Sequence, residues 1–187
     1  MRKFFIILGI FVSVIFLIYL IWPYNPKSVY DFKVLPDSVN STLPGDTVQV
    51  KDLTAFFSDN YRHFVIPFYK DDYRKLVGFP FPPLELNYPP EYAFTVIKDQ
   101  TQSTYLEELT YPFRGSLYIN GLEPFIENTQ EPRFDGATLF GQSGGLYQTK
   151  VILRYYPSSI IFRIVVWIGI NLSVTFLYKV GRRIFYA

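Results

Sequence analysis

The stretch from Phe4 to Trp22, which reads FFIILGIFVSVIFLIYLIW, carries no charged residue. As a helix it is long enough to cross the roughly 30 Å hydrocarbon core of a bilayer. Arg2 and Lys3 precede it, and basic residues also precede the core of a signal peptide. However, the apolar run is longer than such a core, and no small-residue cleavage site follows it. We therefore expect a retained transmembrane helix.

A second apolar stretch, IIFRIVVWIGINLSVTFLY, runs from Ile160 to Tyr178 and is followed by Lys179, Arg182 and Arg183. Basic residues flank membrane helices on the cytoplasmic side. The bases at both ends of the chain therefore predict an integral membrane protein with both termini in the cytoplasm. The predicted parts are a cytoplasmic N-terminus (1–3), transmembrane helices (4–22 and 158–178), a basic cytoplasmic C-terminus (179–187) and a periplasmic, extracellular or lumenal domain (23–157).

Small and polar residues within the two spans predict helix–helix contacts. Arg163 and Asn171 are costly in hydrocarbon unless they find partners, although Arg163 is near enough to one end to extend into the lipid headgroups. Small residues four positions apart let two helices approach closely. The candidate contact residues are Gly9, Ser13, Arg163, Gly169, Asn171 and Ser173. The contact either joins the two spans to each other or joins them to another membrane subunit.

The composition excludes several classes of function. The chain has no cysteine, which rules out a disulfide framework, a thiolate metal site and a thiol nucleophile. It has one histidine, so we expect no transition-metal site, and no motif indicates a cofactor. All acidic residues lie between Asp31 and Asp135, and no basic stripe crosses this region, which argues against nucleic acid as a partner. The sequon at Asn40 has a meaning only in a secretory lumen.

The first half of the external domain has the periodicity of helices. Apolar spacing predicts helices over 52–63, 69–78 and 90–109, and YLEEL (105–109) is the clearest part of the third. Between the second and third, the segment 79–92 contains five prolines, which favour polyproline II. We interpret this segment as a stiff connector in preference to a docking ligand.

The second half has the alternation of strands. Strands are predicted in GSLYINGLEPF (115–125), ATLF (137–140) and LYQTKVILRYY (146–156), with a hairpin turn at Asn120-Gly121. The expected fold is thus a membrane protein in which two transmembrane helices flank one α+β domain. Its first half is expected to be helical and its second half antiparallel β.

The stretch GQSGG (141–145) matches G-x-S-x-G, a pattern that can hold a nucleophilic serine. Ser143 would need a base, and His63, the one histidine, precedes it in the chain, whereas α/β-hydrolases place the histidine after the serine. The stretch also resembles the GDSGG of chymotrypsin-like proteases, but it lacks the acid of that motif. Three glycines between two predicted strands instead favour a hairpin turn or a bulge.

Three functions remain for such a chain. The first is a non-catalytic accessory, assembly or scaffolding subunit of a larger envelope complex, in contact with membrane lipid and with other membrane subunits or further copies of itself. The second is a membrane-anchored ligand-binding or sensing module, with a glycan as the first candidate ligand, because SLYING and RYY loosely resemble sugar-binding β-sandwich modules. The third is an enzyme that uses carboxylates, with Asp71, Asp72, Glu107 and Glu108 as candidates.

Overall fold

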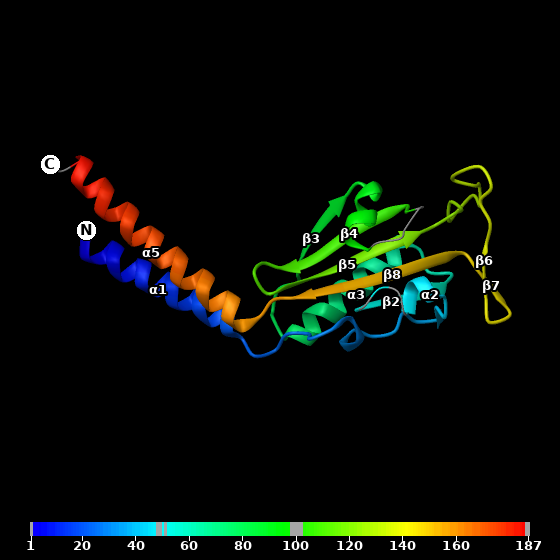
Figure 1. The fold of residues 1–187 in the computed structure, drawn as a ribbon, viewed down its shortest axis with the longest axis horizontal. Helices are drawn as coiled ribbons and strands as arrows, with labels where there is room; N and C mark the ends of the chain where they lie inside the picture. Colours follow the sequence, from blue (N-terminus) through cyan, green and yellow to red (C-terminus); the bar gives the residue numbers. More distant parts are fainter. Residues whose placement is uncertain (1, 48–49, 51, 98–102, 186–187) are drawn as a thin grey trace. The chain divides into compact units, whose positions relative to one another are not determined.

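The computed structural model describes residues 2–47, 50, 52–97 and 103–185 and divides the chain into two compact units (Figure 1). One unit combines Met1–Pro23 with Ser158–Ala187, and the other is Tyr24–Pro157. The fold is α+β, and its sheet is built from antiparallel strands.

The helical unit consists of α1 (Arg2–Ile21) and α5 (Ile160–Phe185). Leu20 contacts Arg163 and Ser13 contacts Asn171, so the two helices run antiparallel to each other. Among the described residues, one helix, Ile160–Ile184, is long and apolar enough to cross a membrane. The apolar part of α1, Ile6–Ile21, is shorter, so the span predicted over 4–22 stays a prediction.

The other unit is built on a six-stranded sheet of order β1-β2-β8-β5-β4-β3. Its strands are β1 (Ser38–Asn40), β2 (Leu53–Ser58), β3 (Leu84–Tyr88), β4 (Tyr105–Tyr111), β5 (Gly115–Leu122) and β8 (Thr149–Pro157). A separate hairpin joins β6 (Phe140–Gln142) to β7 (Gly145–Tyr147). Three strands of the large sheet come from the first half of the domain, so the predicted division into a helical half and a β half is wrong.

Helix α3 (Arg62–Val77) covers one face of this sheet. Its Tyr73 ring packs edge-on against Tyr111 of β4 and Tyr155 of β8, and its hydroxyl donates to the carbonyl of Gly115 at 2.9 Å. The short helix η1 (Val29–Asp31) lies on the same face as α3, because Phe32 at its end packs against Tyr73 and Tyr155. On the other face lie α2 (Pro44–Thr47), η2 (Pro90–Tyr92) and α4 (Ala93–Val96). On that second face Ala93 packs in a core cluster with Leu106 and Ile152.

Both ends of the domain meet at one end of the sheet, here called the base. The fully buried Arg114 lies between β4 and β5, and its Nη2 donates to the carbonyl of Tyr24 at 2.6 Å. Gly115 pairs with Pro157, where β8 ends. The chain therefore enters and leaves the domain at the base. The opposite end of the sheet, at Leu122 and Thr149, is called the distal end.

Two predicted helices are wrong in part. Strands replace their residues 53–58 and 105–109, whereas 90–96 is helical as predicted, in η2 and α4. Residues 53–58 form β2, which lies between β1 and β8 and is buried on both faces. A strand buried on both faces is apolar at nearly every position and loses the alternation by which strands are predicted. YLEEL forms β4 because its two glutamates are also buried, each with its own partner. The helix predicted over 69–78 lies within the longer α3, which ends as predicted at Gly78 in the left-handed conformation.

The predicted turn at Asn120-Gly121 is wrong, because both residues lie inside β5. Gly121 pairs with Tyr105, and a Cβ added at Gly121 would overlap the Tyr105 ring. Glycine is needed here to admit an aromatic ring and not to turn the chain. Within the proline-rich segment 79–92, Leu84–Tyr88 forms β3, and the prolines lie outside it at both ends.

Candidate functional site

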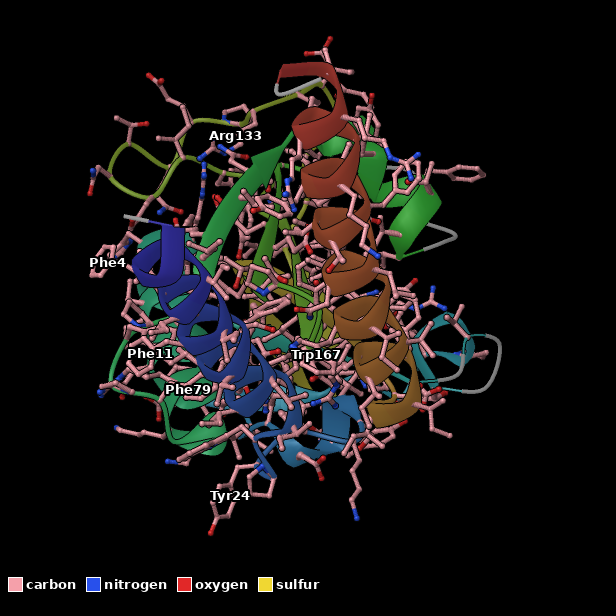
Figure 2. All side chains as sticks on the ribbon, turned by 90° about the vertical axis from the view of Figure 1, so that its left-hand side faces the viewer. Phe4, Phe11, Tyr24, Phe79, Arg133 and Trp167 are labelled. Carbon is pink, nitrogen blue, oxygen red and sulfur yellow. The ribbon has the colours of Figure 1, made fainter. Side chains whose placement is uncertain are left out.

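Three residues of the helical unit form a closed set of hydrogen bonds. Ser13 Oγ donates to Asn171 Oδ1 at 2.7 Å, and Asn171 Nδ2 donates to the carbonyl of Trp167 at 2.8 Å. Trp167 Nε1 in turn donates to the carbonyl of Ser13 at 3.0 Å, from the side of α5 that faces α1 (Figure 2). Ser13 and Asn171 were predicted contact residues. Trp167 was missed, although it stands one helical turn before Asn171.

Arg163 bridges the ends of the same two helices. Its side chain donates from Nη1 to the carbonyl of Leu20 at 3.0 Å and from Nη2 to the carbonyl of Ser158 at 2.7 Å, and it is only 6% exposed. Carbonyls in the last turn of a helix such as α1 lack partners within the helix and favour a cation. The charge of Arg163 thus neutralises the end of α1.

The other predicted contact residues lie outside this contact. A Cβ added at Gly9 or Gly169 would meet nothing within 4 Å, and Ser173 is exposed. Phe4 and Phe11 of α1 point away from α5 (Figure 2). Ser13, Trp167, Asn171 and Arg163 therefore join α1 to α5, and apolar side chains such as Phe4 and Phe11 form much of the outer surface.

The structure does not assemble the candidate catalytic carboxylates into one site. Asp71 pairs with Arg74 at 2.7 Å on the surface of α3, and Asp72 accepts the backbone N–H of Lys33 at 3.0 Å. Cationic neighbours hold the pKa of Asp71 below its ordinary value. Both residues therefore stabilise α3 and its surroundings.

Glu107 and Glu108 point to opposite faces of β4, because successive side chains of a strand alternate. Glu107 pairs with Arg62 of α3. Glu108 accepts the hydroxyl of Tyr88 at 2.6 Å on the other face, and this bond to a carboxylate raises the pKa of Tyr88 to about 12. The two carboxylates cannot act together on one substrate.

A charged cleft of about 730 Å³ lies beside the start of α3, and we call it the distal cleft. It is lined by Tyr61, Arg62, His63, Ile66, Pro67, Lys70, Glu85, Glu123, Ile126, Glu127, Asn128 and Arg133. The buried Glu123, just after β5, accepts the backbone N–H of Arg62 at 2.6 Å. Tyr61 supplies no side-chain cap, so Glu123 caps α3 from a distant part of the chain. Burial raises the pKa of the Glu123 carboxyl. It also raises the pKa of Glu107, which pairs with Arg62.

His63 and Ser143 lie in different parts of the domain. His63 Nδ1 lies 2.9 Å from Glu127 Oε2 on the rim of the distal cleft. Ser143 and Gly144 have positive φ values of 50° and 81° and turn the chain between β6 and β7. The prediction of a hairpin turn at GQSGG is confirmed. Ser143 does not line the cleft that contains His63.

The aromatic residues that motivated a glycan site pack mainly against one another. The Tyr118 ring lies 6.4 Å from that of Tyr88 and 5.6 Å from that of Tyr156, and Tyr155 is buried. Tyr156 also donates its hydroxyl to the carbonyl of Val96 at 3.0 Å. The rings of Tyr88, Tyr118 and Tyr156 therefore stabilise the second face of the sheet, whereas Tyr155 packs on the first face against Tyr73 of α3.

Strand β3 forms one edge of the sheet (Figure 1), and no strand of the described residues pairs with its outer side. Leu84 and Leu86 on this edge are 56% and 42% exposed. Glu85 between them pairs with Lys70 of α3 at 2.6 Å, and both line the distal cleft. We call Leu84–Tyr88 the β3 edge.

Comparison with protein-family models, with curated proteins and with solved structures finds no match for this chain. A function can therefore be proposed only from the geometry. Sequence reasoning missed the β3 edge because its prolines indicated a connector. It missed Glu123 and Arg133 because they come together only through the pairing of Phe125 with Pro132 in the loop after β5, which no local pattern indicates.

Proposed function

We propose that this protein is a membrane-anchored, non-catalytic interaction subunit. In this proposal α1 and α5 both cross the membrane as a hairpin, and the domain 24–157 docks a partner protein outside the cytoplasm. The observation that carries the proposal is the convergence of Tyr24 and Pro157 at the base of the sheet. A domain whose two ends leave side by side is suited to two adjacent antiparallel helices.

The helical pair supports the anchoring role. With 20 residues, α1 is about 30 Å long as a helix, which matches a bilayer core. Ser13, Asn171 and Arg163 have their partners within the pair, so the hairpin carries few polar groups to be buried at a cost in lipid. The apolar outer surface is left for lipid or for another membrane subunit.

The domain supports docking over catalysis. The chain ends lie at its base, whereas the distal cleft lies at the other end of β5. Because β5 has eight residues and a strand rises about 3.3 Å per residue, the two are about 25 Å apart. Charged side chains around the cleft are paired with opposite charges, for example Lys70 with Glu85 and Arg133 with Glu123. Such a surface of alternating signs, beside exposed leucines, suits another polypeptide better than a small reacting group.

The test is gentle extraction of the tagged full chain from its own membranes, followed by size analysis and mass spectrometry. We expect a partner that co-elutes at a fixed ratio and stays bound through a second purification step. Two matched variants complete the test. Arg163→Leu should lower the yield of the intact complex, because Arg163 joins the two helices, and Ser173→Ala should preserve it, because Ser173 is exposed. Recovery of a monodisperse monomer under mild conditions would contradict the proposal.

A further inference from the structure

We propose that the β3 edge accepts an extended segment of the partner protein as an added strand; this inference rests on the proposed function. An edge strand presents backbone N–H and C=O groups on its outer side, and an extended chain can pair with them. Among the described residues two strands lie at the edges of this sheet: β1, with three residues, pairs with β2 alone, and β3, with five residues, pairs with β4 alone. All five residues of β3 are at least partly exposed.

The prolines around β3 limit what can bind. Pro82 and Pro83 precede the strand, and Pro89 and Pro90 follow it. Proline has no N–H to donate to a neighbouring strand, so pairing can extend over about five residues only. The edge is therefore protected against open-ended aggregation and fits a short linear segment.

The two faces of β3 predict the sequence pattern of that segment. Leu84 and Leu86 are exposed on the face that also carries the short helices, where Tyr92 and Phe94 are exposed as well. Glu85 lies on the other face and borders the distal cleft with Lys70. An added strand would alternate in the same way. Its apolar side chains would cover the leucines, and its charged or polar side chains would reach the cleft.

A second copy of this chain is not the occupant that the geometry favours. Antiparallel pairing of two β3 edges about Leu86 places Glu85 opposite Asn87 and is chemically acceptable. It reverses one domain, however, so the two bases point in opposite directions and cannot both be tethered to one membrane. Parallel pairing needs a two-fold axis along the strands, which places the leucines of the two copies on opposite faces. A segment of a different protein meets neither obstacle.

The test uses the full chain in lipid nanodiscs and a defined probe. The probe is a fluorescein-labelled heptapeptide in which valine alternates with lysine and glutamate. Its control is the same peptide with N-methylated alternate residues, which removes the backbone donors. We expect saturable binding of the probe but not of the control, measured by fluorescence anisotropy. Hydrogen exchange of the amides in 84–88 should slow at least tenfold when the probe binds.

Two single variants provide the matched comparison. Leu86→Lys places a charge on the edge, and Leu146→Lys places the same charge on β7, where the leucine is 69% exposed. We expect the first to lower probe affinity at least tenfold and the second to leave it unchanged. If Leu86→Lys fails to fold, a benzophenone side chain introduced at position 84 should cross-link the probe, and one at position 146 should not.

Other outcomes overturn the inference. Protection that appears around the distal cleft or at β1, with no change at 84–88, would show that the peptide binds elsewhere. A concentration-dependent dimer that protects β3, without probe binding, would identify a second copy as the occupant. The proposed function fails separately: if no partner is recovered from native membranes while the probe still protects β3, the edge accepts strands but the subunit role is wrong.

Discussion

At the scale of single residues, Arg114 is the residue on which the base of the domain depends. Its guanidinium lies 5.1 Å from the ring centroid of Phe79 and donates to the carbonyl of Tyr24, and Asn25 Nδ2 donates to the carbonyl of Arg114 at 3.3 Å. We expect Arg114→Ala to lower the free energy of unfolding by about 2–4 kcal/mol, since buried polar groups lose a charged partner. The control Arg133→Ala, with one contact at 3.4 Å, should cost under about 1 kcal/mol. Denaturant unfolding of the full chain in micelles measures both, and equal costs would contradict this role.

Glu123 predicts a dependence of stability on pH. Burial raises the pKa of its carboxyl above the ordinary 4.5, so the folded protein keeps the proton to higher pH than the unfolded chain does. This contribution to stability is complete below pH 4.5 and is lost as the pH rises through the raised pKa. Glu123→Gln still accepts the N–H of Arg62 but cannot titrate. Between pH 4.5 and 8 the stability of the variant should therefore fall less than that of the wild type. Parallel curves for the two proteins would show that Glu123 does not titrate in this range.

Gly121 gives a purely steric prediction. A methyl group at this position would overlap the Tyr105 ring in the neighbouring strand. We expect Gly121→Ala to destabilise the domain by about 1–3 kcal/mol, the usual cost of overpacking. Gly141→Ala is the control, because its nearest neighbour would be a Leu146 methyl at 3.9 Å. The two thermal midpoints should differ by several degrees. An unchanged midpoint for Gly121→Ala would mean that the ring can move aside.

At the scale of elements, the sequence indicates the long apolar helix, most of the final strand and the turn at Ser143 correctly, because each depends on local chemistry. The strand predicted over 146–156 is divided at Gln148 into β7 and β8. Prediction from the sequence fails where burial by distant parts of the chain removes the local alternation of apolar and polar residues. Leu53–Ser58 lacks alternation because both of its faces are buried. The two glutamates of β4 imitate the polar face of a helix, since their partners Arg62 and Tyr88 come from other elements. The distal cleft could not be predicted for the same reason.

The helix pair yields a prediction at this scale. Asn171 accepts from Ser13 on α1 and donates within α5, so Asn171→Leu removes the bond between the helices and keeps a span-compatible side chain. Interhelical hydrogen bonds in membranes contribute about 0.6 kcal/mol on average and up to about 1.7 kcal/mol. We expect a loss within that range, measured by unfolding in mixed micelles of increasing sodium dodecyl sulfate. Ser173→Ala, at an exposed position, should change nothing. A larger loss in the control would place the contact elsewhere on α5.

At the scale of the whole molecule, the proposed function separates attachment, at the base of the domain, from recognition, at the β3 edge. The buried Arg114 and the pairing of Gly115 with Pro157 fix both chain ends at the base. The β3 edge and the distal cleft share Glu85. A segment bound to the edge would therefore contact the domain with the side chains of both of its faces. This arrangement gives specificity to a five-residue contact that would be weak on backbone pairing alone.

The proposed topology can be tested by cysteine labelling. The chain has no cysteine, so a single introduced cysteine is the only thiol in the protein that can react. Leu146→Cys, on an exposed strand of the domain, should react with a membrane-impermeant maleimide in intact cells. Lys3→Cys and Arg182→Cys should react only after the membrane is permeabilised, since both termini are proposed to be cytoplasmic. Reaction of Lys3→Cys in intact cells, with Arg182→Cys still protected, would mean that α5 alone crosses the membrane. The antiparallel pair of α1 and α5 could not then span the bilayer as a hairpin, and the anchoring part of the proposed function would have to be replaced by a single span.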